Sequence, residues 1–410
     1  MRVTARSTLI GAFGIFAALS VAAFTRSFQG SGLPLKYAGP PTVPDVTAGD
    51  LMTRLYIFSD DSMLGRQFGE IGSARATAYI EREVKALGLA PGGENGTFIQ
   101  QVPSRNRDIR GTAIRDHNVI AIVPGTDDKL KGEYVAITAH SDGLGIKPAP
   151  WVDHDSAHAF NSLARRMGAA TSDNSLRVTP QLWDRIRALT EAARAAHGGP
   201  RIDSVYNGAD FDGSGCVALI EIAEALANGN LKPKRSILFI WHTGSQLSQT
   251  GAFYFVDHPT VPRDSIVAVL NADGIGRGGV SDMTGQSADN FGLSGGPGYL
   301  QLVGTRRISK ELGDLIEAAN TEQRLDLRFD YRLDDPQHQR QLYVNGDHYA
   351  YARKNIPVAL FTTGSHADFE WFTDEAQYVD YDRLETVTKL IMGAALRVAN
   401  LDHRLKLGTK

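Results

Sequence analysis

Two acidic residues in a glycine-rich turn are the first candidates for chemistry in this chain. The stretch Asn207–Gly215 reads Asn-Gly-Ala-Asp-Phe-Asp-Gly-Ser-Gly and places Asp210 and Asp212 among small residues. Apolar runs flank it and a helical pattern follows, so we expect it at a strand–helix junction. Carboxylate oxygens on a backbone that is free to bend suit a metal ion. An ordinary surface turn is the alternative, because Asp, Gly and Ser are also common turn residues.

The composition is that of a globular protein with a single cysteine. The chain has 410 residues, of which 42% are hydrophobic and 22% charged, and its net charge is −3. This allows one large or two modest domains, and nothing indicates a nucleic-acid partner. The lone Cys216 excludes disulfides within the chain and cysteine-cluster metal sites, so any metal must be bound by His, Asp or Glu. Cys216 opens an apolar helix and is expected to be a buried packing residue.

The N-terminal segment is expected to be separate from the fold. Arg2 and Arg6 precede an uncharged, mostly apolar run over 7–24, and residues 1–29 are therefore predicted to be a signal peptide. An uncleaved membrane anchor is the alternative. In both cases the protein is expected to be exported, to the periplasm or the outside of the cell, with membrane contact only if the segment stays uncleaved. Residues 30–45 are rich in Gly and Pro and indicate a linker, and 46–410 indicate one domain.

Strand and helix patterns alternate along this domain. The predicted strands are Asn118–Val123, Tyr134–Ala139, Ser236–Trp241, Ser265–Leu270 and Val358–Thr362. The predicted helices are Thr47–Phe58, Ser73–Leu87, Gly215–Ala227, Ser309–Ala319 and Leu384–Asn400. This alternation predicts a three-layer α/β fold with a mixed, largely parallel sheet.

Polar residues gather where these strands end. His140 follows one strand, Ser245 and Gln246 come soon after another, and Asp273 and the segment His366–Glu370 follow two more. In open α/β sheets, ligands bind beyond the carboxyl ends of the strands. We therefore expect these residues to form a single site.

The stretch 145–204 is too long for a simple connection and is predicted to be an insertion. It contains a helical pattern over Pro180–Ala196 and the pair His154 and His158. The i,i+4 spacing of this pair could place two metal ligands on one helix face. We favour a solvated surface insertion, because no third ligand is evident nearby in the sequence.

Seven short blocks occur in a characteristic order along the chain. They are Ala139–Asp142, Tyr206–Gly215, Trp241–Gly244, Leu270–Gly276, Gly346–Tyr349, Thr363–Phe369 and Val379–Tyr381. From about Asp50 to its end, the chain thus resembles the co-catalytic zinc exopeptidases of the bacterial leucyl aminopeptidase and aminopeptidase Y type. The resemblance implies a zinc-exopeptidase-like (phosphorylase/hydrolase-like) fold and removal of N-terminal residues from peptides.

The resemblance also assigns metal ligands. The family uses two zinc ions bridged by one Asp, and the matching block places that bridge on Asp210. His140 and Asp273 would complete the first zinc site. Asp142 would orient the ring of His140, as outer carboxylates commonly do for a metal-bound imidazole.

Four positions depart from the family pattern. Where the family has two consecutive glutamates, the general base and a ligand of the second zinc, this chain has Ser245 and Gln246. Where the family has its last zinc ligand, a His, this chain has Glu370. A hydroxyl cannot take a proton from zinc-bound water near neutral pH, and a neutral amide is a weak zinc ligand. Asp212 stands where the family usually has Asn.

Two functions therefore remain open. One is a metallo-exopeptidase that retains one zinc ion rather than two and has weak or no activity, with a relocated base among Glu370, Asp212, His242 and His366. The other is a non-catalytic protein that binds peptides or a protein partner through the old cleft. His348 and His366 are expected to line the pocket rather than to bind metal.

Overall fold

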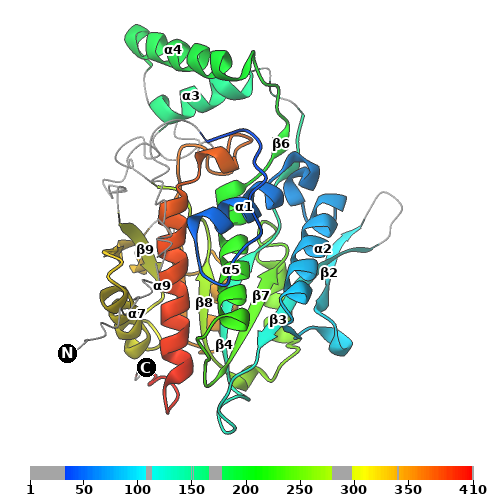
Figure 1. The fold of residues 1–410 in the computed structure, drawn as a ribbon, viewed down its shortest axis with the longest axis vertical. Helices are drawn as coiled ribbons and strands as arrows, with labels where there is room; N and C mark the ends of the chain where they lie inside the picture. Colours follow the sequence, from blue (N-terminus) through cyan, green and yellow to red (C-terminus); the bar gives the residue numbers. More distant parts are fainter. Residues whose placement is uncertain are drawn as a thin grey trace, which may run out of the picture.

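The computed structural model describes residues 33–107, 113–148, 150, 152–165, 178–278, 298–338 and 341–408. In these residues a mixed sheet of nine strands forms the centre, in the order β1-β3-β7-β4-β8-β11-β9-β10, with β2 beside β3 (Figure 1). Its strands are β1 (Ala90–Pro91), β2 (Ile99–Arg107), β3 (Ala113–Val123), β4 (Tyr134–His140), β7 (Ser236–His242), β8 (Ile266–Ala272), β9 (Tyr299–Val303), β10 (Arg328–Asp330) and β11 (Val358–Thr362). A separate pair consists of β5 (Gly145–Ile146) and β6 (Val205–Tyr206).

The middle of the sheet is parallel. β4 lies between β7 and β8 and pairs in parallel with both, and β11 continues this order beside β8. β3 and β9 pair antiparallel with β7 and β11. The predicted mixed, largely parallel α/β fold is therefore confirmed. The sequence did not predict β1, β2, β9 or β10. β2 is mostly polar, and β1 and β10 have only two and three residues.

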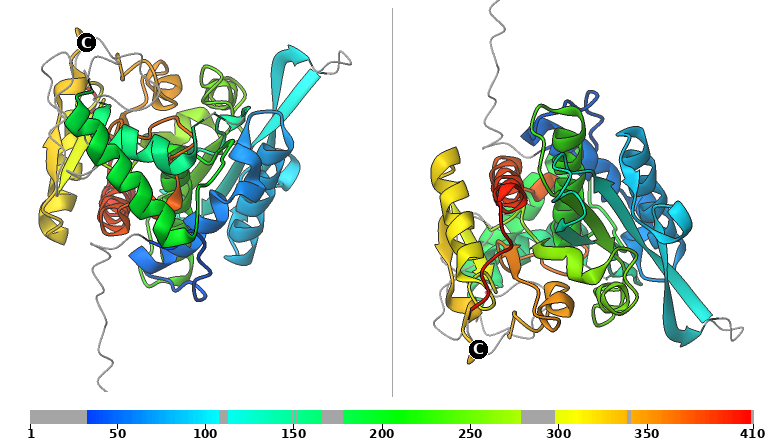
Figure 2. Two further views of the ribbon diagram at one scale, coloured as in Figure 1. Left: turned by 90° about the horizontal axis from the view of Figure 1, so that it is seen from above. Right: turned by 90° about the horizontal axis from the view of Figure 1, so that it is seen from below.

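Helices cover both faces of the sheet, as Figures 1 and 2 show. They are α1 (Ala48–Phe58), α2 (Ile71–Ala86), α5 (Gly215–Asn228), α6 (Thr250–Asp257), α7 (Lys310–Gln323), α8 (His348–Ala352) and α9 (Tyr381–Asn400). Alternate strand residues enter two different cores. In β7, Phe239 packs in the core with α1, α2, α5, α7 and α9, whereas Leu238 packs with α6 and α8. Burial on both faces explains why these strands are almost wholly apolar.

The insertion carries two further helices, α3 (His154–Ala164) and α4 (Pro180–His197), which lie at the top of Figure 1. The prediction that His154 and His158 are on a solvated face is wrong. His154 is fully buried, and Nδ1 of His158 lies 2.9 Å from Oδ2 of Asp368. Asn161 donates to the same carboxylate at 3.0 Å. The sequence concealed these contacts because the partner lies about two hundred residues further along the chain.

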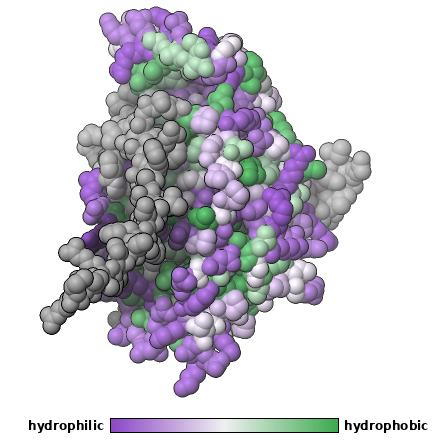
Figure 3. All heavy atoms as spheres, viewed as in Figure 1, coloured by the Kyte–Doolittle hydropathy of each residue, from purple (hydrophilic) through white to green (hydrophobic). Residues whose placement is uncertain are grey.

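The N-terminal predictions fall largely outside the described residues. The predicted signal segment and the first residues of the linker belong to 1–32. Within the described part of the chain, every helix is too short or too polar to cross a membrane. Figure 3 shows hydrophilic and hydrophobic residues mixed over the face in view.

Candidate metal centre

The candidate site forms where the central parallel strands end. β4 ends at His140, next to the end of β7 at His242. Asp273 follows β8 directly, and its backbone N–H donates to the carbonyl of Phe361 in β11. Because the strands are adjacent and parallel, residues far apart in the sequence meet at one edge of the sheet.

His140 and Asp273 present two metal-binding atoms to each other. Nε2 of His140 lies 3.9 Å from Oδ1 of Asp273, and both atoms are buried and have no hydrogen-bond partner in the described structure. Nδ1 of His140 lies 3.1 Å from the carbonyl oxygen of Asp142. A carbonyl only accepts, so Nδ1 carries the hydrogen and Nε2 of the neutral ring keeps its lone pair. A zinc ion about 2 Å from each atom fits between them, and a tetrahedral site would draw them about 0.5 Å closer.

The third member of this group is Asp212. The donor atoms of His140, Asp212 and Asp273 all lie within 4.8 Å of one another. The sequence-based prediction had placed Asp210 there and left Asp212 as a spare carboxylate. Asp212 also holds the backbone in place: its oxygens accept N–H groups of His140, Gly215 and Gly274 at 3.0 to 3.1 Å.

Asp210 faces a different neighbour. Its Oδ1 accepts the N–H of Gly276 at 2.6 Å, and its Oδ2 lies 3.5 Å from Nε2 of His366. The backbone N–H of Asp368 donates to Nδ1 of His366 at 3.2 Å, so Nε2 of the neutral ring carries a hydrogen toward Asp210. Oδ2 of Asp210 thus faces His366, and Asp210 is not among the three residues that group around His140. Only Phe211 separates the two acids, so the sequence alone does not show which of them reaches His140.

The electrostatics of the group indicate missing positive charge. Burial raises the pKa of Asp212 well above its usual value and also raises the pKa of Asp273. Burial opposes the charged form of His140, but Asp142, Asp212 and Asp273 outweigh it and hold the pKa of this imidazole well above 6.5. A divalent cation would stabilise two neighbouring carboxylates and an imidazole, of which His140 and Asp273 each have a buried donor atom without a partner. The residues present therefore fit a zinc ion.

Ser245 and Gln246 follow β7 in a tight turn. Their backbone N–H groups donate to the two carboxylate oxygens of Asp142 at 2.9 and 3.1 Å. Asp142 also lies 3.4 Å from Nδ1 of His140, so this carboxylate joins the turn to the predicted ligand. The side chains that the turn offers to the site are a hydroxyl and an amide, both half-buried.

Two further carboxyls and a phenyl ring surround the group. Burial and then Asp273 raise the pKa of Glu370, which places this side chain in the field of the centre. Burial raises the pKa of Asp347 to about 7, and Asp142 and Asp273 add to the effect. The ring of Phe211 lies with its edge toward His140, with 5.0 Å between the ring centres. An apolar ring thus occupies space beside the predicted ligand.

The other predicted pocket residues lie in a second layer. His348 is fully buried beside Tyr343, and burial lowers its pKa to about 4. Nε2 of His242 lies 2.9 Å from the hydroxyl of Tyr351. Cys216 is buried, and its thiol donates to the carbonyl of His140 at 3.0 Å.

Sequence reasoning missed the roles of Arg66 and Asp347. Arg66 is fully buried, and its guanidinium donates to four backbone carbonyls at 2.6 to 3.2 Å, those of Phe58, Ser141, Asn207 and Gly208. It therefore ties the loop after His140 to the loop that carries Asp212. The only feature of the nearby sequence that could have pointed to this role of Arg66 is the preceding glycine, Gly65. In the block Gly346–Tyr349, the sequence analysis singled out His348 and assigned no role to Asp347.

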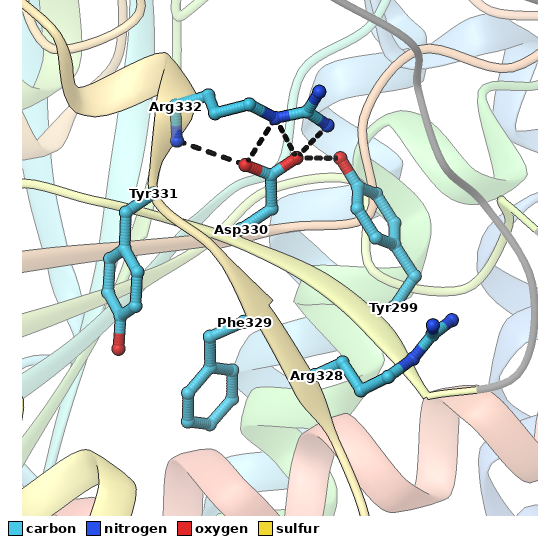
Figure 4. A pocket seen from close by; sticks show the side chains of 6 residues that line it. All are labelled: Tyr299, Arg328, Phe329, Asp330, Tyr331 and Arg332. Carbon is cyan, nitrogen blue, oxygen red and sulfur yellow. Dashed lines mark hydrogen bonds and ion pairs between the residues drawn. The ribbon is translucent and has the colours of Figure 1, made fainter.

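Two surface hollows lie apart from these residues. One, of about 590 Å³, lies at the β10 edge of the sheet, where Asp330 is held by Arg332 and Tyr299 (Figure 4). Another, of about 450 Å³, lies between α3 and α4 and reaches Trp371, the neighbour of Glu370.

Comparisons with known proteins identify the family of this chain. Residues 118–395 match Peptidase family M28, and the chain belongs to this family. A segment of 81 residues is 35% identical to leupeptin-inactivating enzyme 1 of Streptomyces exfoliatus, and this match spans only 19% of the chain and 18% of that protein. The predicted resemblance to co-catalytic zinc exopeptidases is thereby confirmed.

Solved structures show the same fold. The LapA aminopeptidase of Legionella pneumophila superposes with a TM-score of 0.54 at 15% identity, over 87% of this chain and 73% of its own. The glutaminyl cyclase of Porphyromonas gingivalis reaches 0.53 at 13% identity, over 85% and 97%. A Zn-dependent exopeptidase of Parabacteroides distasonis reaches 0.52 at 15% identity, over 87% and 99%. At these identities the likeness concerns the fold alone.

Proposed function

We propose that this protein is a metallo-exopeptidase-like member of family M28 that binds peptides and, at the site of His140, one zinc ion instead of the co-catalytic pair, and hydrolyses N-terminal residues slowly or not at all. The observation that carries the proposal is the pairing of Nε2 of His140 with Oδ1 of Asp273, two buried atoms without another partner. Family membership supports a peptide ligand. The side chains of Ser245 and Gln246 support the loss of activity.

Each residue has a defined part in this proposal. His140 and Asp273 bind the zinc ion, Asp212 stands beside them, and Asp142 fixes the ring of His140. Zinc, when bound, supplies a Lewis acid for a peptide carbonyl and lowers the pKa of water. The Ser245 hydroxyl cannot accept a proton from water near neutral pH, and loss of a positioned general base typically lowers a rate by ~10²–10⁴.

A slow one-zinc hydrolase is favoured over a purely binding protein by one observation. The carboxyl of Asp347 has a pKa of about 7, is buried, and lies in the field of Asp142 and Asp273. A carboxyl with a pKa near neutrality suits general base catalysis. Asp347, or Glu370, would then accept the proton that Ser245 cannot.

The cellular location of the protein is also proposed. We propose export to the periplasm or the cell exterior, supported by the charged and apolar pattern of residues 1–29. Cell fractionation tests this, since the proposal requires the protein outside the cytoplasm. A nucleic-acid partner is not part of the proposal.

One experiment separates the two functions. Zinc content and release of amino acids from aminoacyl-nitroanilides are measured for the natural chain and for a variant with Ser245→Glu, Gln246→Glu and Glu370→His. A second variant adds Phe211→Asp, which replaces the ring beside His140 with a carboxylate. Slow turnover of the natural chain that Asp347→Asn abolishes supports the hydrolase. Turnover at the rate of ordinary aminopeptidases contradicts the proposal, and no turnover with retained peptide binding supports the binding protein.

A further inference from the structure

A second group of metal-binding side chains lies where the insertion meets the body of the protein. His154 opens α3, Asp203 lies near the end of the insertion, and Glu375 belongs to the segment before α9. The donor atoms of the three all lie within 4.8 Å of one another. The sequence showed no third ligand near His154 because Glu375 lies 221 positions further along the chain, and the structure brings the two residues together.

The atoms that face each other in this group are close. Nδ1 of His154 lies 3.2 Å from Oδ2 of Asp203 and 3.4 Å from Oε1 of Glu375. Two ligands about 2.0 to 2.2 Å from one tetrahedral ion are separated by about 3.4 Å. The side chain of His154 is buried, and those of Asp203 and Glu375 are 12% and 9% exposed.

The outer polar atom of each side chain is already held by a neighbour. Nε2 of His154 lies 3.3 Å from the hydroxyl of Tyr378. Oδ1 of Asp203 accepts the N–H of Val205 at 2.9 Å, and Oε2 of Glu375 accepts both guanidinium nitrogens of Arg201 at 3.4 Å. Metal ligands are typically oriented in this way by outer hydrogen bonds. On the inward side, Nδ1 of His154 lies within hydrogen-bond distance of Oδ2 of Asp203, and a bound ion would replace this hydrogen bond.

The inward side of the group includes an oxygen from each of two carboxylates, whose negative charges repel each other unless a proton or a cation lies between them. Arg201 lies 3.4 Å from Oε2 of Glu375 on the outer side, and it is shared with Asp155 at 3.7 Å. A divalent ion would replace the protons and allow both carboxylates to be ionised.

We propose that His154, Asp203 and Glu375 bind a zinc ion that fastens the insertion to the body of the protein. The ligands come from the start of the insertion, from its end and from the body, so the ion would join all three segments. An imidazole with two carboxylates is a zinc ligand set, and a fourth position is open to water. A hollow of about 270 Å³ lined by Asp61, Arg201 and Glu375 gives access from solvent. This ion is independent of the zinc proposed at His140.

The test measures zinc in the full chain after dialysis against a weak chelator. A variant with His140→Ala and Asp273→Ala removes the first site. We expect two equivalents in the natural protein, one in this variant, and none when Glu375→Gln or Asp203→Asn is added. His158→Asn is the matched control, because it lies on the same helix outside the group, and one equivalent should remain.

A second readout covers the case in which a variant folds poorly. Zinc should raise the melting temperature of the variant that lacks the first site, and Glu375→Gln or Asp203→Asn should abolish that rise. Unchanged zinc content in both of these variants would mean adventitious binding elsewhere and would overturn the proposal. Absence of zinc from the variant that lacks only His140 and Asp273 would overturn it too, leaving a hydrogen-bonded network only. Loss of the first zinc alone would contradict the proposed function and leave this inference standing.

Discussion

The two sides of the candidate centre differ in what they offer a metal ion. On one side, His140 and Asp273 present buried donor atoms with no other partner. On the other side, the turn after β7 presents the side chains of Ser245 and Gln246, and the ring of Phe211 faces His140. The fold keeps both sides in place, so what differs is the chemistry of a few side chains. Under the proposed function, the fold would hold one ion at His140 and Asp273 without a co-catalytic pair.

The largest loss of zinc affinity is expected on the side that presents His140 and Asp273. His140→Ala or Asp273→Asn should lower zinc affinity at this site by more than the ~10–100-fold that outer residues control, because a direct ligand is lost. Isothermal titration with zinc in the Glu375→Gln background isolates the site. A zinc affinity within threefold of that of the Glu375→Gln variant alone would mean that the ion has other ligands. It would contradict the proposed difference between the two sides.

Asp142→Asn should have the next largest effect. The carboxylate lies 3.4 Å from Nδ1 of His140 and accepts the N–H groups of Ser245 and Gln246. Its neutral amide should lower zinc affinity by about 10–100-fold. The same titration checks this, and an unchanged affinity would mean that the backbone carbonyl of Asp142 alone orients the ring.

The pH dependence of zinc binding follows from the raised pKa values of the ligands. Protons compete with zinc for His140 and Asp273, and both groups hold protons to a higher pH than usual. Zinc affinity should therefore rise with pH and fall as the pH is lowered. Titrations from pH 5 to pH 8 test this direction, and an affinity independent of pH would contradict the ligand assignment.

Arg66→Met should affect stability through both sides of the site. The variant leaves buried carbonyls of Phe58, Ser141, Asn207 and Gly208 without a donor, which should lower the free energy of unfolding by about 3 kcal/mol or more. Urea denaturation measures the change. Arg82→Met, at an exposed position, is the control and should change it by no more than about 0.5 kcal/mol.

The smallest effect is expected from Gln246→Ala. A neutral amide is a weak zinc ligand, so zinc affinity should stay within about threefold of the natural value. A loss as large as that of Asp142→Asn would show that Gln246 binds the ion, and the contrast between the two sides would disappear.

The sequence predicted the sheet and the edge where the site forms because both depend on local patterns. Apolar runs such as Tyr134–Ala139 mark buried strands, and His140 and Asp273 follow such runs directly. The choice between Asp210 and Asp212 depends on the backbone around Phe211 and on His366, which no local pattern shows. The burial of His154 depends on Asp203 and Glu375, which reach it only through tertiary packing. Local order was therefore predictable, whereas contacts between distant segments were not.

The most direct test of the account is a crystal structure of the zinc-loaded protein with anomalous scattering at the zinc edge. The account predicts one peak between Nε2 of His140 and the carboxylate of Asp273, with no second peak beside it. Two peaks about 3.5–4 Å apart at this position would show a co-catalytic pair and contradict the account.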